Sequence, residues 1–173
     1  MTGKHLVLIG LMGAGKTSVG NECASRLRRP FVDTDDLVTS SARLSVANIF
    51  ATKGELGFRA LERVVVADVC ASPEPLVVAC GGGTVVDPDN RRALRRAGLV
   101  VWLRAPVATL LDRVGDGSDR PLLRDDPEGA LLRLGRLREM TYEAASHASV
   151  ETDGLDVAAV ADAVLSVFEG AAA

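Results

Sequence analysis

Short apolar runs alternate along this chain with longer segments in which apolar residues return every three or four positions. The runs lie at 6–9, 31–32, 76–80 and 99–103, and a further short strand is expected at about 149–152. Uninterrupted apolar runs are typical of strands buried on both faces of a parallel sheet, whereas the longer period is that of an amphipathic helix. The alternation predicts an α/β fold, with a parallel β-sheet of about five strands and helices on both faces.

The helices are delimited by start and stop signals. Pro88 follows Asp87 at the first position of a helix, where proline is favoured, and the pattern is interrupted around Gly54 and Gly57. From 115 to 127 the composition turns to Gly, Asp, Arg and Pro, which predicts a mobile loop. We expect helices around 19–27, from about 37, over 46–54 and 58–69, from 88, from 106, over about 128–145 and over 157–168.

Length and composition fit one compact domain. The chain has 173 residues, 47% of them hydrophobic, and no internal repeat or linker, so we expect a single domain over 1–173. A net charge of −3 argues against nucleic-acid binding and favours a small-molecule partner. The three cysteines lack C-x-x-C spacing, which suggests neither a disulfide framework nor a zinc site. Without a leader pattern or a bilayer-length apolar run, the sequence predicts a cytoplasmic protein with no membrane partner.

Residues 10–17 read Gly-Leu-Met-Gly-Ala-Gly-Lys-Thr, the G-x-x-x-x-G-K-[ST] pattern of a phosphate-binding P-loop. The motif lies between an apolar run and an amphipathic segment, the strand–loop–helix order that it requires, so a chance glycine-rich turn is the weaker explanation. Backbone N–H groups would surround a polyphosphate, Lys16 would reach the outer phosphates, and Thr17 would hold Mg²⁺. The residues expected to contact the nucleotide here are Gly13, Ala14, Gly15, Lys16, Thr17 and Ser18.

Acidic and glycine residues follow two later strands at their carboxyl ends, where ligands gather in parallel sheets. The third strand runs into the glycine triplet 81–83 and so lacks the aspartate that orders Mg²⁺ in many P-loop proteins. Asp33, at the end of another strand, is the candidate that replaces it. Asp35 lies two residues further on, and we assign helix capping to Asp36. The glycines would let bare backbone approach a substrate closely, with a flexible turn as the alternative.

Four arginines are candidates for binding a small anion, because the guanidinium group makes bidentate hydrogen bonds. They are Arg59, Arg113, Arg120 and Arg138. Each one alone is better explained as a solvated surface residue. Together with the P-loop they indicate a phosphotransfer site.

With these motifs in this order, the chain resembles the shikimate kinases over about residues 5–152. Besides the P-loop, the shared motifs are D-x-D at 33–35, G-E-x-G-F-R at 54–59, G-G-G at 81–83, R-P-L-L at 120–123 and R-x-x-x-Y at 138–142. The resemblance implies a P-loop kinase fold with a mobile lid at about 113–127 and a helical substrate-binding insertion at about 33–61. It also implies transfer of the ATP γ-phosphoryl group to the 3-hydroxyl of shikimate, in the chorismate pathway to aromatic amino acids.

The resemblance assigns an acceptor site as well. Asp35 would contact the shikimate hydroxyls and accept the proton of the attacking one. Arg59 and Arg138 would bind the substrate carboxylate, and Gly82 would add a backbone contact. The substrate-binding residues that it implies are Asp35, Arg59, Gly81, Gly82, Gly83 and Arg138.

In the nucleotide site, the resemblance implies that Lys16 and Arg120 neutralise charge on the transferred phosphoryl group. Asp33 would hold Mg²⁺ through water, beside Thr17. Lys16, Asp35 and Arg120 form the implied catalytic set. Adenine contacts are implied for Arg113, Thr152 and Asp153, in the part of the chain where the likeness is weakest.

Two alternatives remain open at the level of sequence. Another small-metabolite kinase of this fold, such as gluconate kinase, would explain the P-loop and the lid but not the pair Arg59 and Arg138. A silent nucleotide-binding module would tolerate loss of the catalytic set or of Asp33, yet all of these residues are present. The expected partners are ATP/ADP and shikimate. The resemblance implies a monomer, and the chain carries no heptad pattern that would contradict it.

Overall fold

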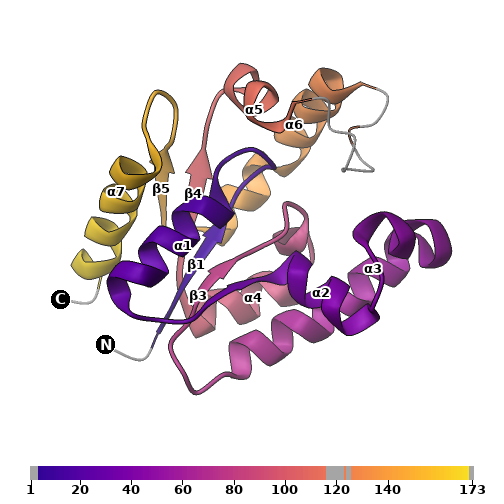
Figure 1. Ribbon diagram of the computed structural model, residues 1–173, viewed down its shortest axis with the longest axis horizontal. Helices are drawn as coiled ribbons and strands as arrows, with labels where there is room; N and C mark the ends of the chain where they lie inside the picture. The colour runs from indigo at the N-terminus through magenta and orange to yellow at the C-terminus, as the bar shows by residue number, and fades with distance from the viewer. Residues whose placement is uncertain (1–3, 116–122, 124–125, 172–173) are drawn as a thin grey trace.

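The computed structural model describes residues 4–115, 123 and 126–171. Its sheet has five strands in the order β2-β3-β1-β4-β5, and every strand pairing is parallel (Figure 1). The strands are β1 His5–Ile9, β2 Phe31–Asp33, β3 Val77–Ala79, β4 Gly98–Arg104 and β5 Ala148–Glu151. The predicted α/β fold is confirmed, and each predicted strand is present with its bounds shifted by one residue at most.

The central strand β1 divides its side chains between two hydrophobic cores. Leu6 and Leu8 pack in a core that includes residues of α1 and α7, whereas Val7 and Ile9 pack in a core with residues of α3, α4 and α6. All four side chains are at most 1% exposed. Both faces of the sheet are therefore covered, which explains why the strand reads as an uninterrupted apolar run.

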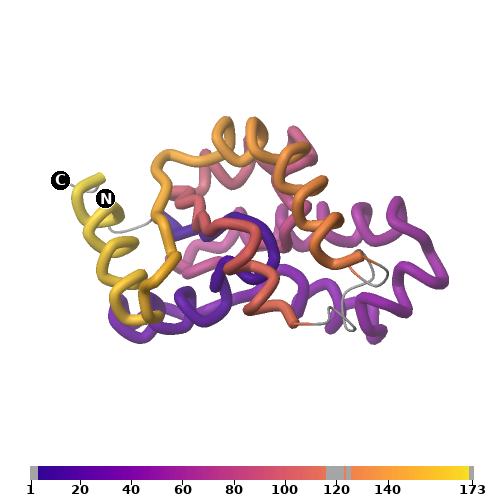
Figure 2. The backbone as a smooth tube through the Cα atoms, turned by 90° about the horizontal axis from the view of Figure 1, so that it is seen from above, coloured from indigo at the N-terminus to yellow at the C-terminus, as the bar shows by residue number. Residues whose placement is uncertain are grey.

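Helices surround the sheet, and some of them project beyond it at one end of the molecule. Seen from above, α2 and the first part of α3 lie at one end of the molecule and α7 lies at the other (Figure 2). The helices are α1 Lys16–Leu27, α2 Thr34–Ala42, α3 Val46–Ala71, α4 Pro88–Ala97, α5 Val107–Val114, α6 Pro127–Ala145 and α7 Val157–Gly170, with a short 3₁₀ turn η1 at Thr84–Val86.

The start of α2 corrects one prediction. The helix begins at Thr34, earlier than the expected position near 37, and its N-cap is Asp33, whose Oδ1 accepts a hydrogen bond of 3.0 Å from the Asp35 N–H. The assignment of capping to Asp36 was wrong, because Asp36 already lies in the first helical turn. Asp33 thus closes β2 and opens α2 within a single residue.

The predicted interruption near Gly54 is a kink inside α3. Gly54 has φ 67° and ψ −177°, which is not helical, and the segments before and after it take different directions. A positive φ favours glycine because it has no Cβ. The kink separates the part of α3 that projects with α2 from the part that packs on the sheet.

The predicted mobile loop at 115–127 falls mostly outside the described residues, and Arg120 falls outside with it. Leu123 is described and is completely buried in the core that contains Leu110 and Leu131. In the described part of the chain, no helix has the length and apolar character needed to cross a membrane.

Candidate active site

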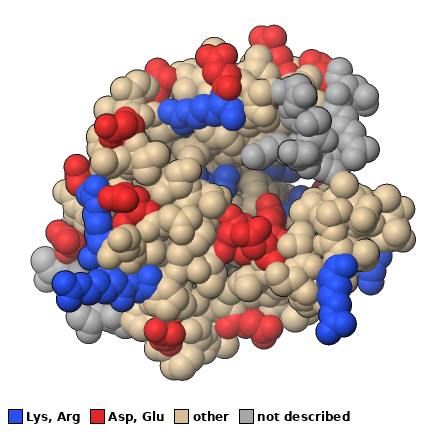
Figure 3. Space-filling model, viewed as in Figure 1, with Lys and Arg blue, Asp and Glu red and all other residues tan. Residues whose placement is uncertain are grey.

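A pocket of about 820 Å³ opens where the carboxyl ends of the strands meet. Figure 3 shows the hollow in the surface, with basic side chains in its depth and a group of acidic side chains at its edge. The predicted site residues that line the pocket are Gly13, Ala14, Gly15, Lys16, Thr17, Ser18, Asp33, Asp35, Arg59, Gly81, Gly82, Gly83, Arg113, Arg138 and Thr152. Asp153 is not among the lining residues, and Arg120 lies outside the described part of the chain.

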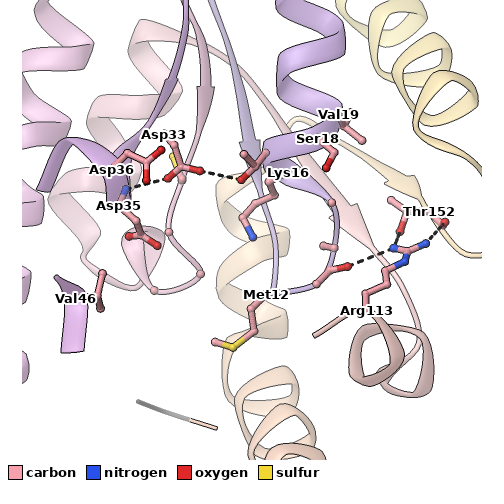
Figure 4. Close-up of a pocket in the computed structure, with 18 of the residues that line it drawn as sticks. Met12, Lys16, Ser18, Val19, Asp33, Asp35, Asp36, Val46, Arg113 and Thr152 are labelled. Atoms are coloured by element: carbon pink, nitrogen blue, oxygen red, sulfur yellow. Dashed lines mark hydrogen bonds between the residues drawn. The ribbon is translucent and has the colours of Figure 1, made fainter. Parts of the chain in front are cut away.

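The P-loop forms one wall of this pocket. Gly15 has φ 93° and occupies the N-cap position of α1, which directs the free N–H groups of the first helical turn toward the pocket. Lys16 Nζ donates hydrogen bonds of 2.9 Å to the carbonyl oxygens of Gly10 and Leu11. The Lys16 side chain therefore folds back over the P-loop, and its ammonium group points into the part of the pocket that Asp35 also faces (Figure 4).

A hydroxyl and a carboxylate meet beside the P-loop. Thr17 Oγ1 donates a hydrogen bond of 2.9 Å to Asp33 Oδ2, while Asp33 Oδ1 caps α2. Oxygen donors of this kind suit Mg²⁺. The described residues contain no group of three or more His, Cys, Asp or Glu side chains able to hold a metal. Mg²⁺ here would draw its remaining ligands from phosphate and water, as is usual for this ion in phosphoryl-transfer sites.

Asp35 is the carboxylate most strongly affected by its surroundings. Burial raises its pKa from 3.8 to about 6, and the neighbouring carboxylates of Asp33 and Glu62 act in the same direction. The positive charges of Lys16 and Arg59 oppose the shift. A carboxyl group with a pKa near 6 is still largely ionised at neutral pH, yet basic enough to accept a proton from a hydroxyl group during reaction.

Arg59 is held by a buried carboxylate that sequence analysis missed. Arg59 Nη1 donates a hydrogen bond of 2.8 Å to Glu62 Oε2, and Thr84 Oγ1 donates one of 2.7 Å to Glu62 Oε1. Glu62 and Thr84 are both completely buried. The available signal was spacing, because a glutamate one turn after Arg59 stands among the apolar positions of α3 and faces the interior.

Arg138 presents an unsatisfied donor. The residue is 7% exposed, and its Nη1 has no hydrogen-bond partner among the described residues. One turn further along α6, the Tyr142 hydroxyl donates a hydrogen bond of 2.6 Å to the Gly82 carbonyl oxygen. Burial raises the pKa of Tyr142 to about 12, against the opposing effect of the charge of Arg138 and its interaction with the hydroxyl, so this hydroxyl stays protonated. A buried guanidinium nitrogen without a partner is rare, and here it lines a pocket that an anionic ligand can enter.

The opposite end of the pocket is closed by Arg113. Its Nη1 donates to Thr152 Oγ1 at 2.9 Å and its Nη2 to the Thr152 carbonyl oxygen at 2.8 Å, with a longer bond of 3.3 Å from Nη1 to the Gly13 carbonyl oxygen (Figure 4). Arg113 thereby joins the P-loop to the loop after β5. Asp153, expected at the adenine, instead accepts a hydrogen bond from Thr109.

Apolar side chains complete both ends of the pocket, and sequence analysis named none of them as site residues. Three lie on α3, near Arg59, and the others lie beyond Thr152, in the loop before α7 and at the start of that helix. They are Val46, Phe50 and Phe58 at the first end and Leu155, Val157 and Val160 at the second. Phe58 stands inside the G-E-x-G-F-R motif, so it could have been noticed. The others become neighbours only through the fold.

Comparison with known proteins gives a consistent result. A family model described as "Shikimate kinase" matches residues 12–169. Similar curated proteins include a shikimate kinase of Symbiobacterium thermophilum, 51% identical over 86% of this chain and 87% of its own length, and one of Francisella philomiragia, 39% identical over 89% and 88%.

Solved structures agree with the sequence matches. A shikimate kinase from Acinetobacter baumannii in complex with shikimate superimposes with a TM-score of 0.94 at 34% identity, covering 97% of this chain and 94% of that one. A shikimate kinase from Aquifex aeolicus gives a TM-score of 0.85 at 30% identity, covering 97% and 98%. A gluconokinase from Sinorhizobium meliloti gives a TM-score of 0.56 at 16% identity over 99% and 97%, which is a likeness of fold alone.

Proposed function

Because the chain belongs to the shikimate kinase family, a family of kinases, we propose that it transfers the γ-phosphoryl group of ATP to the 3-hydroxyl of shikimate. The products are shikimate 3-phosphate and ADP, and the step belongs to the chorismate pathway to aromatic amino acids. The observation that carries the proposal is the buried Nη1 of Arg138, which has no hydrogen-bond partner within residues 4–115, 123 and 126–171 and belongs to the same pocket as Arg59 and Asp35.

The two arginines bind the carboxylate of the acceptor. Arg59 and Arg138 come from α3 and α6, and both approach the glycine turn at 81–83, because a Cβ at Gly83 would meet Arg59 and a Cβ at Gly82 would lie 3.4 Å from Arg138 Nη1. Their guanidinium groups thus flank one small volume, and a carboxylate within it would satisfy the free donor of Arg138. Phe50 and Phe58 line the same region of the pocket and suit the carbon ring of shikimate.

Asp35 binds the acceptor hydroxyls and takes the proton of the attacking one. As the 3-hydroxyl oxygen forms its bond to the γ-phosphorus, the bond from that phosphorus to the bridging oxygen of ADP breaks, and the hydroxyl proton passes to Asp35. The raised pKa of Asp35, about 6, supports this role because a stronger acid would be a poorer base. Gly81, Gly82 and Gly83 line the acceptor site with backbone, and Gly82 contributes a backbone contact.

The P-loop binds the phosphates of ATP. N–H groups of 13–18 surround the polyphosphate, and Lys16 moves from the loop carbonyls to the outer phosphates. Mg²⁺ bound by Thr17, and by Asp33 through water, would neutralise charge on the phosphate oxygens. The hydrogen bond between Thr17 and Asp33 supports this assignment because it holds both oxygen donors at one point.

The adenine lies at the other end of the pocket. Arg113 and Thr152 border that end together with Leu155 and Val157, whose apolar side chains suit the faces of a purine. We extend the adenine site to Asp153, although its carboxylate accepts a hydrogen bond from Thr109. Arg120 completes the catalytic set by neutralising charge on the transferred phosphoryl group.

We propose further that the chain is one domain over 1–173, with a substrate-binding region at about 33–61 and a lid at about 113–127. It acts as a monomer in the cytoplasm. Size-exclusion chromatography with light scattering tests the oligomeric state directly.

A coupled assay for ADP release tests the function. Purified protein with ATP and Mg²⁺ is supplied with shikimate, with gluconate or with no acceptor. We expect release with shikimate alone, and ³¹P NMR of the product identifies the phosphorylated position. Release with gluconate instead, or equal release in all three reactions, would overturn the proposal.

A further inference from the structure

The backbone conformation at residues 81–83 does not explain why all three are glycine. The described glycines with positive φ are Gly10, Gly13, Gly15, Gly54, Gly115 and Gly154, and none of the triplet is among them. Gly83, for example, has φ −102° and ψ −5°, which any residue adopts. Alanine at these positions would therefore not meet the strain of a positive φ. The reason for glycine must lie in the space around each Cα.

The space beside Gly81 and Gly83 is occupied by side chains assigned to bind the acceptor, those of Asp35 and Arg59. A Cβ built on Gly81 would overlap Asp35 Oδ1 and lie 3.1 Å from its Cγ. A Cβ built on Gly83 would overlap Arg59 Nη2 and lie 2.7 Å from both Cζ and Nη1. Contacts this short do not persist, so the side chain would have to move. The crowded atoms are the terminal carboxylate of Asp35 and the guanidinium at the far end of the flexible Arg59 side chain, not backbone, so the fold can accept the change while the functional group is displaced.

The triplet is also tied to the three elements that carry these side chains. The Gly81 N–H donates a hydrogen bond of 2.9 Å to the hydroxyl of Thr34, the residue before Asp35. The Gly82 carbonyl accepts from Tyr142, one turn from Arg138. After Gly83, the Thr84 hydroxyl donates to Glu62, which in turn accepts from Arg59. The turn is thus fixed relative to α2, α6 and α3 at once.

We propose that Gly81 and Gly83 are positioning residues whose missing side chains reserve the volumes of the Asp35 carboxylate and the Arg59 guanidinium, and that they thereby set the distance between the hydroxyl and the carboxylate of an accepted substrate. The inference rests on the proposed function and deepens it. It differs from a purely backbone role, in which bare main chain at the turn is needed only for contact with the substrate.

Single substitutions should affect different steps. Gly83→Ala displaces the Arg59 guanidinium, so the KM for shikimate should rise about 10-fold or more, the loss expected when a charge-assisted hydrogen bond is misplaced, with a smaller change in kcat. Gly81→Ala displaces the Asp35 carboxylate, so kcat should fall about 10²-fold or more, the usual contribution of a positioned general base. The KM for ATP should change less than about 2-fold in both, because the affected side chains face the acceptor.

A double-mutant cycle separates reserved volume from any other role of the glycine. Dissociation constants for shikimate are measured by NMR titration, which reaches weak binding and needs no turnover. In an Arg59→Ala background no guanidinium remains to be displaced, so adding Gly83→Ala should change the dissociation constant less than about 2-fold. In an Asp35→Ala background, where Arg59 is intact, Gly83→Ala should weaken binding by the full factor seen in the otherwise unchanged protein.

Gly135→Ala is the matched control, since the nearest atom to its added Cβ is Leu11 Cδ1 at an ordinary 3.5 Å. It should leave both kinetic constants unchanged, and thermal melting should show all variants folded. If Gly83→Ala weakened binding equally without Arg59, the reserved-volume proposal would be wrong. If the unsubstituted protein failed to bind or phosphorylate shikimate, the proposed function would fail instead. Even in that case, crystal structures of the two variants without ligands would decide the inference. It requires Asp35 to be displaced in Gly81→Ala and Arg59 to be displaced in Gly83→Ala.

Discussion

Arg59 and Arg138 are assigned to the same substrate carboxylate, yet their substitution should have opposite effects on stability. Arg138 Nη1 is buried without a partner among the described residues, and an unsatisfied buried donor costs about 1–3 kcal/mol. Arg138→Met replaces the guanidinium by an apolar side chain of similar length. It removes the interaction of Arg138 with the Tyr142 hydroxyl but keeps the hydrogen bond from Tyr142 to Gly82. We therefore expect the free energy of unfolding without ligand to stay constant or to rise by about 1–3 kcal/mol.

Arg59→Met should do the reverse, because it removes the cation that faces Glu62. Glu62 is completely buried, and leaving one member of a buried ion pair without its partner costs about 3–5 kcal/mol. The lower value applies here, since Thr84 still donates a hydrogen bond to Glu62 and the Arg59 side chain is 21% exposed. The expected loss is about 3 kcal/mol.

Urea unfolding of the two variants and the unsubstituted protein gives the comparison, and m-values show whether the transition stays cooperative. Melting temperatures check it, at about 2–4 °C per kcal/mol for a chain of this size. Both variants should raise the KM for shikimate by about 10-fold or more, through loss of a charge-assisted hydrogen bond. An Arg138→Met variant that was destabilised as much as Arg59→Met would refute the argument, since it would mean that Arg138 is satisfied in the native protein.

Further predictions concern Asp35, Asp33 and Arg120. Asp35→Asn should lower kcat by about 10²–10⁴-fold, with ATP binding unchanged when measured by calorimetry. Asp33→Asn should instead raise the Mg²⁺ concentration needed for half-maximal rate. Equal loss of nucleotide affinity in the two variants would contradict the assignment of Asp35 to the acceptor and of Asp33 to Mg²⁺. Because Asp35 must be ionised to act as the base, kcat/KM for shikimate should fall as the pH is lowered through about 6. Since folding raises this pKa, the ionised carboxyl is destabilising, so Asp35→Asn should be more stable than the unsubstituted protein at pH 7, and the difference should disappear as the pH falls from about 6 toward 4. Arg120→Ala should lower kcat by about 10³-fold with smaller changes in either KM, and Arg120→Lys should recover only part of the rate.

The parts of the fold that follow from local pattern were predictable from sequence. Apolar runs located four of the five strands, β1 to β4, and Pro88 after Asp87 located the start of α4. The acidic cluster after β2 was harder, because Asp33, Asp35 and Asp36 are all good capping residues. The choice among them depends on where the chain leaves the sheet, and the register of β2 against β3 ends the strand at Asp33. The cap is therefore set by a tertiary contact and not by propensity.

The same limit applies to the site. The P-loop, the glycine triplet and the arginine motifs could be recognised because their residue types and spacing are unusual. Thr84 and Tyr142 could not be assigned roles, because each acts by contact with a residue far along the chain: Thr84 meets Glu62, and Tyr142 meets Gly82. For Glu62 the sequence held one signal, its spacing of three residues from Arg59. Leu155 and Val157 are ordinary apolar residues in the sequence, and only the fold brings them beside Arg113.

In the acceptor site, two side chains near the glycine turn at 81–83 are in energetically unfavourable states. Asp35 is a desolvated carboxylate beside two other carboxylates, and Arg138 carries a buried donor that has no partner in the part of the chain that the structure describes. A substrate with a hydroxyl and a carboxylate supplies a partner to each, so part of its binding energy comes from relieving these states. Gluconate also carries a carboxylate and hydroxyls, so functional groups alone do not explain a preference for shikimate. The fixed turn at 81–83 explains this preference, because it sets one distance between the bound hydroxyl and the bound carboxylate. The rigid ring of shikimate can match that distance without loss of conformational entropy, whereas an open chain must be ordered to reach it.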